Sequence, residues 1–169
     1  MNVQELRGHI DDLLAAQHVM SLATTGKHGE AHAASLFYAV VGLSLVWTSD
    51  PATRHSQHVE GPCRVAATIA PDCADFLAVR GLQIFGVARR LVDAGEVERA
   101  SGRMLERFPF LERLASGPVA LREAWARAGF YRLEPQRITL IDNSRGFGHK
   151  ASLQIHADGT VALAETSHH

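Results

Sequence analysis

The sequence has few cysteines, almost no net charge and no long apolar run. Its 169 residues include only Cys63 and Cys73, too few for a disulfide framework and not spaced as a CxxC pair. A net charge of -1 gives no general attraction to nucleic acid. No run approaches membrane-spanning length, and the first residues lack the pattern of a signal peptide. We therefore expect a cytoplasmic protein that binds neither nucleic acid nor a membrane.

The composition is that of a globular chain. Hydrophobic residues make up 46% of the sequence and charged residues 21%. A length of 169 residues predicts one domain, spanning residues 1–169, because no repeat, low-complexity tract or linker divides it. The closing Ser167-His168-His169 suits either a native end or the remnant of an expression tag, and we give it no functional weight.

Hydrophobic periodicity predicts a mainly β fold with helices added. Residues 3–16 have the three-and-four spacing of an amphipathic helix, and a second helix follows Asp93 and Glu96, which stand at capping-box spacing. Two short helical pieces fill residues 110–128. Alternating segments predict strands at residues 18–25, 30–41, 43–49, 64–70, 82–93 and 130–143, and a hairpin at 153–163. Gly86 inside its strand predicts a bulge or a bend. This order favours a small antiparallel barrel or a sandwich.

The stretch from Trp47 to Pro62 is the first candidate site. An alternating strand ends at Asp50-Pro51, and Thr53-Arg54-His55 then opens a short helix. The free N–H groups of a helix start, the hydroxyls of Thr48, Ser49 and Thr53, and the fixed cation of Arg54 would together bind a phosphate. The alternative is an ordinary strand–turn–helix connection in which Thr53 only caps the helix. The residues alone favour that alternative slightly.

Three motifs in a fixed order carry a resemblance to a known family. They are Thr53-Arg54-His55, then Arg80-Gly81-Leu82-Gln83 with Gly86, then the stretch from Asp142 to Lys150. With the strands around them, they resemble the pyridoxamine 5'-phosphate oxidase-like FMN-binding split barrels, and within that superfamily the small bacterial YhbP-type proteins, over about residues 3 to 150. The resemblance implies a six-stranded antiparallel split β-barrel of Greek-key type, with an N-terminal helix and a late helical insertion. It also implies a homodimer with FMN at the subunit interface.

The resemblance also implies roles for single residues. Arg54 matches the basic phosphate ligand, with Thr48, Ser49 and Thr53 as hydroxyl donors, and His55 stands where many members have lysine. Gln83 matches the glutamine at the polar edge of the flavin, and Ser35, Leu36 and Phe37 match the strand along the isoalloxazine ring. The family's tryptophan and arginine–histidine signature for the substrate phosphate is missing from the C-terminal part. We therefore expect bound FMN but not oxidation of pyridoxamine phosphate.

The glycine-rich stretch from Asp142 to Lys150 is the second candidate site. Phe147 lies among polar residues and glycines, where an aromatic side chain has little reason to stand unless it covers something. One hypothesis is that Phe147, with Arg145 or Lys150 nearby, closes over the flavin site of the partner subunit. An equally weighted alternative is an aromatic plug folded onto its own barrel.

Histidine pairs suggest metal binding only weakly. His55 and His58 are three residues apart and His28 and His32 four apart, but no cysteine or carboxylate completes a ligand set. We expect solvated or capping histidines and no metal site. No side chain stands out as an acid–base catalyst. The prediction is an FMN-dependent oxidoreductase acting on an unknown small molecule; the alternative is a non-catalytic dimeric module that binds a flavin or another phosphorylated ligand.

Overall fold

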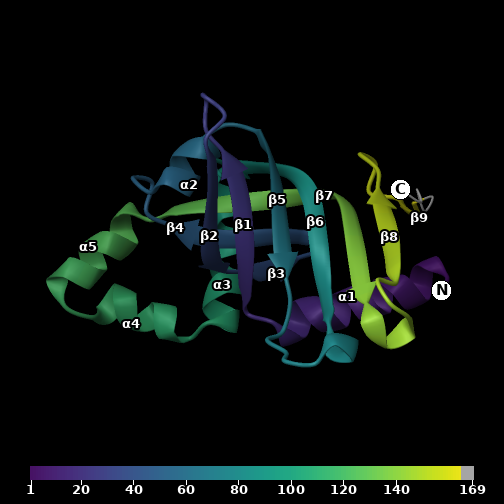
Figure 1. The fold of residues 1–169 in the computed structure, drawn as a ribbon. Coiled ribbons are helices and arrows are strands. Elements are labelled where there is room, and N and C mark those ends of the chain that lie inside the picture. The colour runs from purple at the N-terminus through teal and green to yellow at the C-terminus, as the bar shows by residue number, and fades with distance from the viewer. Residues whose placement is uncertain (165–169) are drawn as a thin grey trace.

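The computed structural model describes residues 1–164, and the closing Ser167–His169 lies outside the described residues. The described chain forms an antiparallel sheet of nine strands in the order β2-β1-β5-β6-β7-β4-β3, with β8 paired to β7 and β9 to β8 (Figure 1). The strands are β1 (Val19–Thr25), β2 (Ala31–Phe37), β3 (Ala39–Val41), β4 (Ser44–Ser49), β5 (Cys63–Ile69), β6 (Arg80–Arg90), β7 (Gly129–Asp142), β8 (Lys150–Ile155) and β9 (Val161–Leu163). The helices are α1 (Val3–Ala16), α2 (Arg54–His58), α3 (Ala94–Arg107), α4 (Phe110–Ser116) and α5 (Val119–Arg127), with 3-10 turns η1 (Phe76–Ala78) and η2 (Asn143–Arg145).

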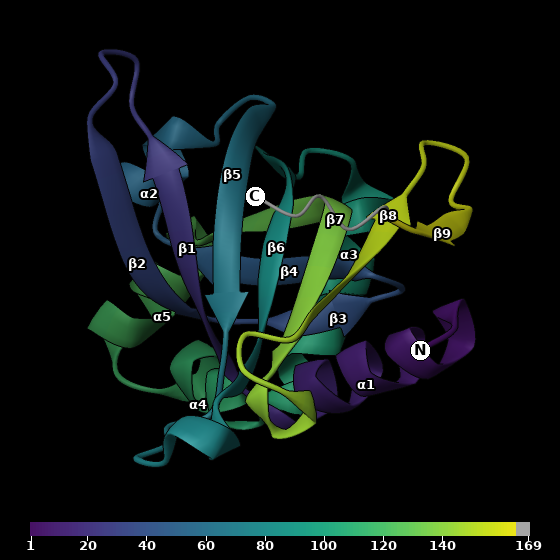
Figure 2. The same ribbon diagram turned by 45° about the vertical axis from the view of Figure 1, so that its right-hand side comes forward.

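The sheet curls into an open barrel. Strands β2, β1, β5 and β6 form one wall, and β3 and β4 cross behind them (Figures 1 and 2). Within the described residues β2 pairs only with β1, although it lies close to β4, so the barrel is split between these two strands. This confirms the predicted antiparallel split barrel with an N-terminal helix and late helices. The sheet has more than six strands because the short β3, β8 and β9 extend it.

The single strand predicted at residues 30–41 is wrong, because the chain breaks at Tyr38. The Tyr38 side chain is fully buried, and its hydroxyl lies 3.0 Å from the carbonyl oxygen of Leu14 and 2.9 Å from that of Gln17. Arg107 of α3 donates to the same carbonyl groups and lies over the Tyr38 ring. These contacts satisfy the C-terminal carbonyl groups of α1 and tie that helix to the barrel.

The bulge predicted at Gly86 is confirmed. The register between β6 and β7 shifts between Phe85 and Gly86, opposite Pro135. A Cβ atom at Gly86 would stand 2.1 Å from the carbonyl oxygen of Glu134, so only glycine fits here without a backbone shift. Proline suits the opposite position because a bulge removes the need for its missing N–H donor.

The predicted helical insertion is confirmed as α3, α4 and α5. Helix α3 buries Ala100 and Met104 against β3 and β4. Helix α5 buries no residue, and with α4 it projects to one side of the barrel (Figure 1). The N-terminal α1 starts with a capping box between Asn2 and Glu5 and covers one end of the barrel with Leu6 and Ile10.

Candidate functional site

The hydroxyl groups expected near α2 form a hydrogen-bonded network with an imidazole. His55 Nε2 lies 2.8 Å from Ser49 Oγ and 3.1 Å from Thr53 Oγ1. Thr53 Oγ1 also donates to the Asp50 carbonyl oxygen and lies 2.8 Å from Ser56 Oγ. The Thr53 side chain therefore does not cap the helix, which corrects the simpler interpretation of the sequence. Helix α2 has only five residues, so its dipole adds little to anion binding.

His55 is a buried neutral group, which corrects the expectation of a solvated or capping histidine. Its side chain is 8% exposed, and burial is the main reason that its pKa is lowered from 6.5, with the charges of His32 and His58 adding to the effect. The His32 ring stacks on it at 6.0 Å, and the His58 ring meets His32 edge-on at 6.1 Å. His58 Nδ1 in turn lies 2.9 Å from Thr24 Oγ1. These contacts fix His55 as a hydrogen-bonding group that positions Ser49 and Thr53.

Arg54 supplies the positive charge at this end of the barrel. It is exposed, and it lines a hollow of about 810 Å³ between the β1–β2 turn and the α2–β5 connection, together with Lys27. Arg54 has no ion pair within the part of the chain that the structure describes. Glu30 and Glu60 also line the hollow, but Glu60 pairs with Arg90 at 2.9 Å. The pKa of Glu30 is lowered, mainly by hydrogen bonds from backbone N–H groups. This carboxylate therefore stays charged and partly balances Arg54 and Lys27.

Gln83 lies in a row of hydroxyl groups that crosses the outer face of the sheet. Six residues on six neighbouring strands lie side by side because each pairs directly with the next. They are Ser35, Ser21, Thr68, Gln83, Thr139 and Ser152. The Gln83 amide is exposed and forms no hydrogen bond with another described residue. It lines a hollow of about 260 Å³ beside Thr68 and Arg137. An unpaired amide among hydroxyls offers both a donor and an acceptor to a ligand.

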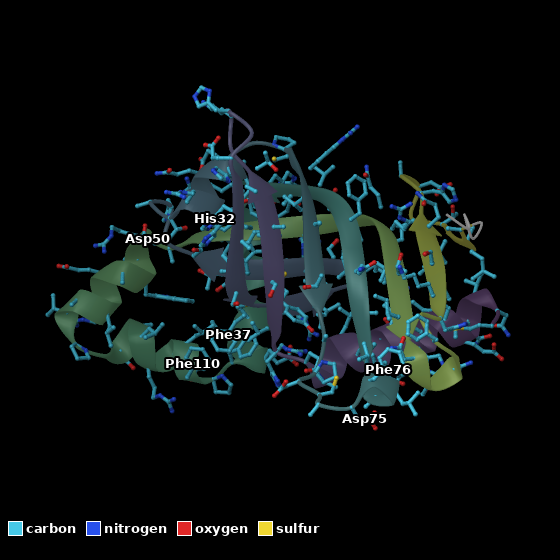
Figure 3. The ribbon with its side chains drawn as sticks, viewed as in Figure 1. His32, Phe37, Asp50, Asp75, Phe76 and Phe110 are labelled. Atoms are coloured by element: carbon cyan, nitrogen blue, oxygen red, sulfur yellow. The ribbon has the colours of Figure 1, made fainter. Side chains whose placement is uncertain are left out.

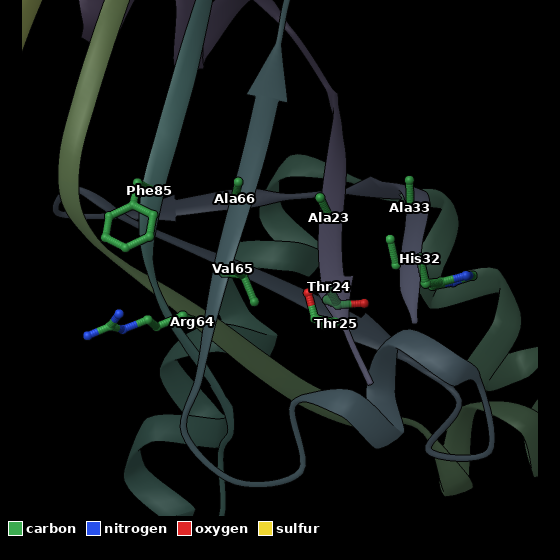
Figure 4. A pocket seen from close by; sticks show the side chains of 10 residues that line it. Ala23, Thr24, Thr25, His32, Ala33, Arg64, Val65, Ala66 and Phe85 are labelled. Atoms are coloured by element: carbon green, nitrogen blue, oxygen red, sulfur yellow. The ribbon is translucent and has the colours of Figure 1, made fainter. Parts of the chain in front are cut away.

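The next row on the same face consists of three alanines and one phenylalanine. Ala33, Ala23, Ala66 and Phe85 pair across β2, β1, β5 and β6. They line a hollow of about 430 Å³ (Figure 4). This hollow shares Thr25 with the Arg54 hollow, and it shares Ala66 and Phe85 with the Gln83 hollow. The three hollows therefore adjoin one another, from the Arg54 end of the barrel to the outer face beside Gln83.

The residues of β2 that the sequence assigned to a flavin ring divide between two faces. Ser35 and Phe37 are exposed on the outer face, whereas Leu36 is half-buried against the core. Phe37 contacts Phe108 at 5.1 Å and Phe110 at 5.4 Å, so it joins β2 to α3 and α4 (Figure 3). Thr48 donates to the Gly129 carbonyl oxygen at 3.1 Å, which engages its hydroxyl proton within the sheet.

Phe147 and Lys150 lie elsewhere in the subunit. Lys150 begins β8, and β1, β5, β6 and β7 separate β8 from β2 in the sheet. Phe147 is 85% exposed and stacks on Phe76 with ring centroids 5.0 Å apart. It is therefore not a plug buried in its own barrel. One subunit does not bring Phe147 or Lys150 to Arg54, and covering a partner's flavin remains a hypothesis.

Comparison with known proteins identifies the family. A family model described as pyridoxamine 5'-phosphate oxidase matches residues 6–142, which is most of the chain. The chain belongs to the pyridoxamine 5'-phosphate oxidase family. A relative from Salmonella schwarzengrund, UPF0306 protein YhbP, is 32% identical over 140 residues, covering 81% of this chain and 85% of that protein. The resemblance to YhbP-type proteins is thus confirmed.

Solved structures share the fold. A pyridoxamine 5'-phosphate oxidase-related, FMN binding protein from Nostoc punctiforme has a TM-score of 0.66 at 13% identity, covering 95% of this chain and 96% of that one. A heme binding protein from Mycobacterium smegmatis has a TM-score of 0.68 at 20% identity. The match covers 86% of this chain and 56% of that protein. At such identities the likeness concerns the fold alone.

Sequence reasoning missed the grouping of His32 with His55 and His58. His28 and His32, four residues apart in the sequence, do not contact each other, because His28 lies in the exposed β1–β2 turn while the His32 ring stacks on His55 of α2. The alternation of outward and inward positions along β2, which places His32 on the inward side, could have indicated this grouping. The described residues contain no group of three or more histidine, cysteine or acidic side chains placed to hold a metal ion. In the same part of the chain, no helix is long and apolar enough to cross a membrane.

Proposed function

We propose that this member of the pyridoxamine 5'-phosphate oxidase family binds FMN on the outer face of β2, β1, β5 and β6, and that it works as a homodimeric oxidoreductase on a small molecule. The observation that carries the proposal is the series of adjoining hollows from the cation Arg54 to the unpaired amide Gln83. The FMN binding protein with the same fold adds support. The proposal includes a cytoplasmic location, which the free thiols of Cys63 and Cys73 suit.

The Arg54 end of the face suits the phosphate of FMN. Arg54 is an exposed, unpaired guanidinium group in the described chain, and Lys27 lines the same hollow. A phosphate dianion is bound best by a planar guanidinium group with neutral donors beside it. Ser49, held by His55 Nε2 at 2.8 Å, is the hydroxyl at this end that can supply such a donor, because Thr53, next to Arg54 in the sequence, already donates its proton to the Asp50 carbonyl oxygen.

The Gln83 end suits the flavin ring. Ala33, Ala23 and Ala66 leave room for a flat group against the sheet, and Gln83 offers a donor and an acceptor to its polar edge. Bound FMN would supply hydride or electron transfer. Arg137 lines the same hollow as Gln83, and its positive charge favours the more negative, reduced form of the cofactor.

A second copy of the chain would cover this face. Val19 and Phe37 pair directly and are 41% and 47% exposed at one end of it, and Phe85 is 37% exposed beside Ala66. Large apolar side chains exposed on one face favour a protein interface. In such a homodimer Phe147 and Lys150 of one subunit are the residues we assign to the flavin site of the other.

Titration of the purified protein with FMN tests the proposal. We expect saturable binding, seen as a change in flavin absorption and fluorescence, and about a tenfold or greater loss of affinity in Arg54→Ala, because a charge-assisted hydrogen bond contributes about 1.5–3 kcal/mol. Arg99→Ala, which removes an exposed arginine from α3, is the matched control and should bind like the parent. Absence of FMN binding, or equal binding by the Arg54 and Arg99 variants, would refute the proposed site.

One observation favours the non-catalytic alternative. The hollow beside Gln83 is lined by hydroxyls, an amide and the Arg137 guanidinium, without a carboxylate or an imidazole among its described residues. A chain that only holds the cofactor needs no acid–base group. If FMN binds but neither NADH nor NADPH reduces it, and reduced FMN in the complex transfers no electrons to acceptor dyes, the binding module is the better description.

A further inference from the structure

A second group of basic side chains lies between α1 and the η2 turn. Arg80 begins β6, Arg145 ends η2 and His9 lies on α1. A terminal guanidinium nitrogen of Arg80 is 3.0 Å from His9 Nδ1, and one of Arg145 is 3.0 Å from His9 Nε2. The imidazole is therefore held between two guanidinium groups.

This arrangement leaves a donor without an acceptor. A neutral imidazole has one N–H group and one acceptor nitrogen, and a guanidinium group only donates. Whichever His9 nitrogen carries the proton, one of the two arginines faces an N–H group. Protonation of His9 would leave both arginines facing donors.

Asp142 balances only part of the positive charge. Its Oδ2 atom lies 3.5 Å from Nε of Arg80 and 3.5 Å from Nε of Arg145, longer than a normal hydrogen bond. Its Oδ1 atom accepts from the Ser144 hydroxyl at 2.6 Å. Arg80 Nε is buried and has no hydrogen-bond partner in the described chain.

The carboxyl of Asp142 remains ionised. Burial alone would raise its pKa, but the hydrogen bonds from Ser144 and the charges of Arg80 and Arg145 lower it. Two guanidinium groups against one carboxylate leave one positive charge in excess. The side chains of Arg80 and Arg145 are 37% and 44% exposed, so a ligand from solvent can reach them.

An exposed aromatic pair is carried by the same two turns. Phe76 and Phe147 stack on each other and are 49% and 85% exposed. Asn143 joins the turns, because its Nδ2 donates to the Phe76 carbonyl oxygen at 3.1 Å and its backbone N donates to the Val79 carbonyl oxygen at 3.0 Å. The aromatic pair is therefore fixed relative to the arginine pair, with Arg80 following η1 and Arg145 ending η2.

We propose that Arg80, His9 and Arg145 form an oxyanion site for the phosphate or carboxylate group of a small molecule whose aromatic or apolar body contacts Phe76 and Phe147. The oxyanion supplies the acceptor that His9 cannot provide and balances the excess charge. The stacked rings, carried by the same two turns, supply apolar contact area for the rest of the molecule. This site is separate from the Arg54 end of the same subunit, and its oxyanion part, Arg80, His9 and Arg145, does not depend on the FMN proposal. Phe147 is also the residue assigned above to the partner's flavin, so the test below is made without FMN.

Titration with inorganic phosphate at constant ionic strength tests the inference. In the isotope-labelled full chain, we expect saturable shifts of the Gly146 and Gly148 amide signals, which report on η2. Arg145→Gln should weaken the response at least tenfold, whereas Arg122→Gln, which removes an exposed arginine from α5, should leave it unchanged. No saturable shift at these amides, or an equal response in Arg145→Gln, would overturn the proposal.

Further variants and ligands distinguish phosphate binding at this site from binding at the FMN site. His9→Glu places a carboxylate between the arginines, so we expect it to abolish the phosphate response in a chain that stays folded. Arg54→Ala should leave the η2 response intact; its loss would assign the signal to the FMN site and overturn the proposal. Phenyl phosphate should bind more tightly than inorganic phosphate. Benzoate should shift the same amide signals, and its failure to do so would overturn the carboxylate part of the proposal. Equal affinities for phenyl phosphate and phosphate would overturn the role of Phe76 and Phe147.

Discussion

Replacing Gly86 with alanine drives a methyl group into the backbone of the neighbouring strand. The new Cβ would stand 2.1 Å from the Glu134 carbonyl oxygen and 2.9 Å from Pro135 Cα. Both neighbours are backbone atoms, so β6 and β7 have to move apart along the longest pairing in the sheet. Overpacking in a protein interior destabilises by about 1–3 kcal/mol, occasionally more. Because no flexible side chain can give way, we expect about 3 kcal/mol at Gly86.

Gly102→Ala is the matched control for this substitution. A Cβ atom at Gly102 meets nothing within 4 Å, and the residue is exposed within α3. Alanine there should stabilise by about 0.5–1 kcal/mol, because glycine loses more conformational freedom on folding. In a chain of this size 1 kcal/mol shifts Tm by about 2–4 °C, so thermal unfolding should show Tm lowered by about 6–12 °C in Gly86→Ala and raised by about 1–4 °C in Gly102→Ala. A Gly86→Ala variant as stable as the parent would show that the bulge does not depend on glycine.

Two further predictions concern buried polar side chains. Tyr38→Phe removes the hydroxyl that bonds the α1 carbonyl groups and should destabilise by about 1–3 kcal/mol in urea unfolding. Burial raises the pKa of Tyr38 to about 12, so the parent should lose stability as pH rises from 10 towards 12, and a Tyr38→Phe variant with the same alkaline loss would contradict this. The pKa of His55 is lowered from 6.5, so its contribution is complete above pH 6.5 and is lost as pH falls below that value. His55→Gln should therefore lose less stability than the parent between pH 7.5 and pH 5, and equal losses would show that His55 is not the titrating group.

Features set by neighbouring residues could be predicted from the sequence. Alternation of apolar side chains placed most strands within two residues of their observed ends, since one buried face per strand produces that pattern. Gly86 predicted the bulge because a glycine inside a strand is typical of a bulge or a close approach of two backbones. The cap at Asp93 was right in part: its side chain accepts from Glu96 N, but the Glu96 carboxylate pairs with Arg89 at 2.8 Å and Arg132 at 3.2 Å and does not return to the helix start.

Features set by distant segments could not be predicted from spacing. The break at Tyr38 depends on acceptors in α1, and the position of His55 depends on the stacking of His32 from β2. The row through Gln83 exists only because the register of five strand pairs brings hydroxyl residues into line. Even the correct register would not have joined Arg80 to His9, because that contact depends on where α1 crosses the barrel end.

Arg54 and His55 are neighbours in the sequence with opposite environments. Burial, together with the charges of His32 and His58, lowers the pKa of His55 and keeps it neutral, while Arg54 stays exposed and unpaired among the described residues. Charge attraction for a phosphate at this end must therefore come from Arg54 and Lys27, and His55 can act only by holding the hydroxyls. The family resemblance implies lysine at the position of His55 in many members, and a neutral imidazole there leaves the proposed phosphate dependent on the neighbouring guanidinium. The Arg54 variant therefore decides whether this end of the barrel is a phosphate site.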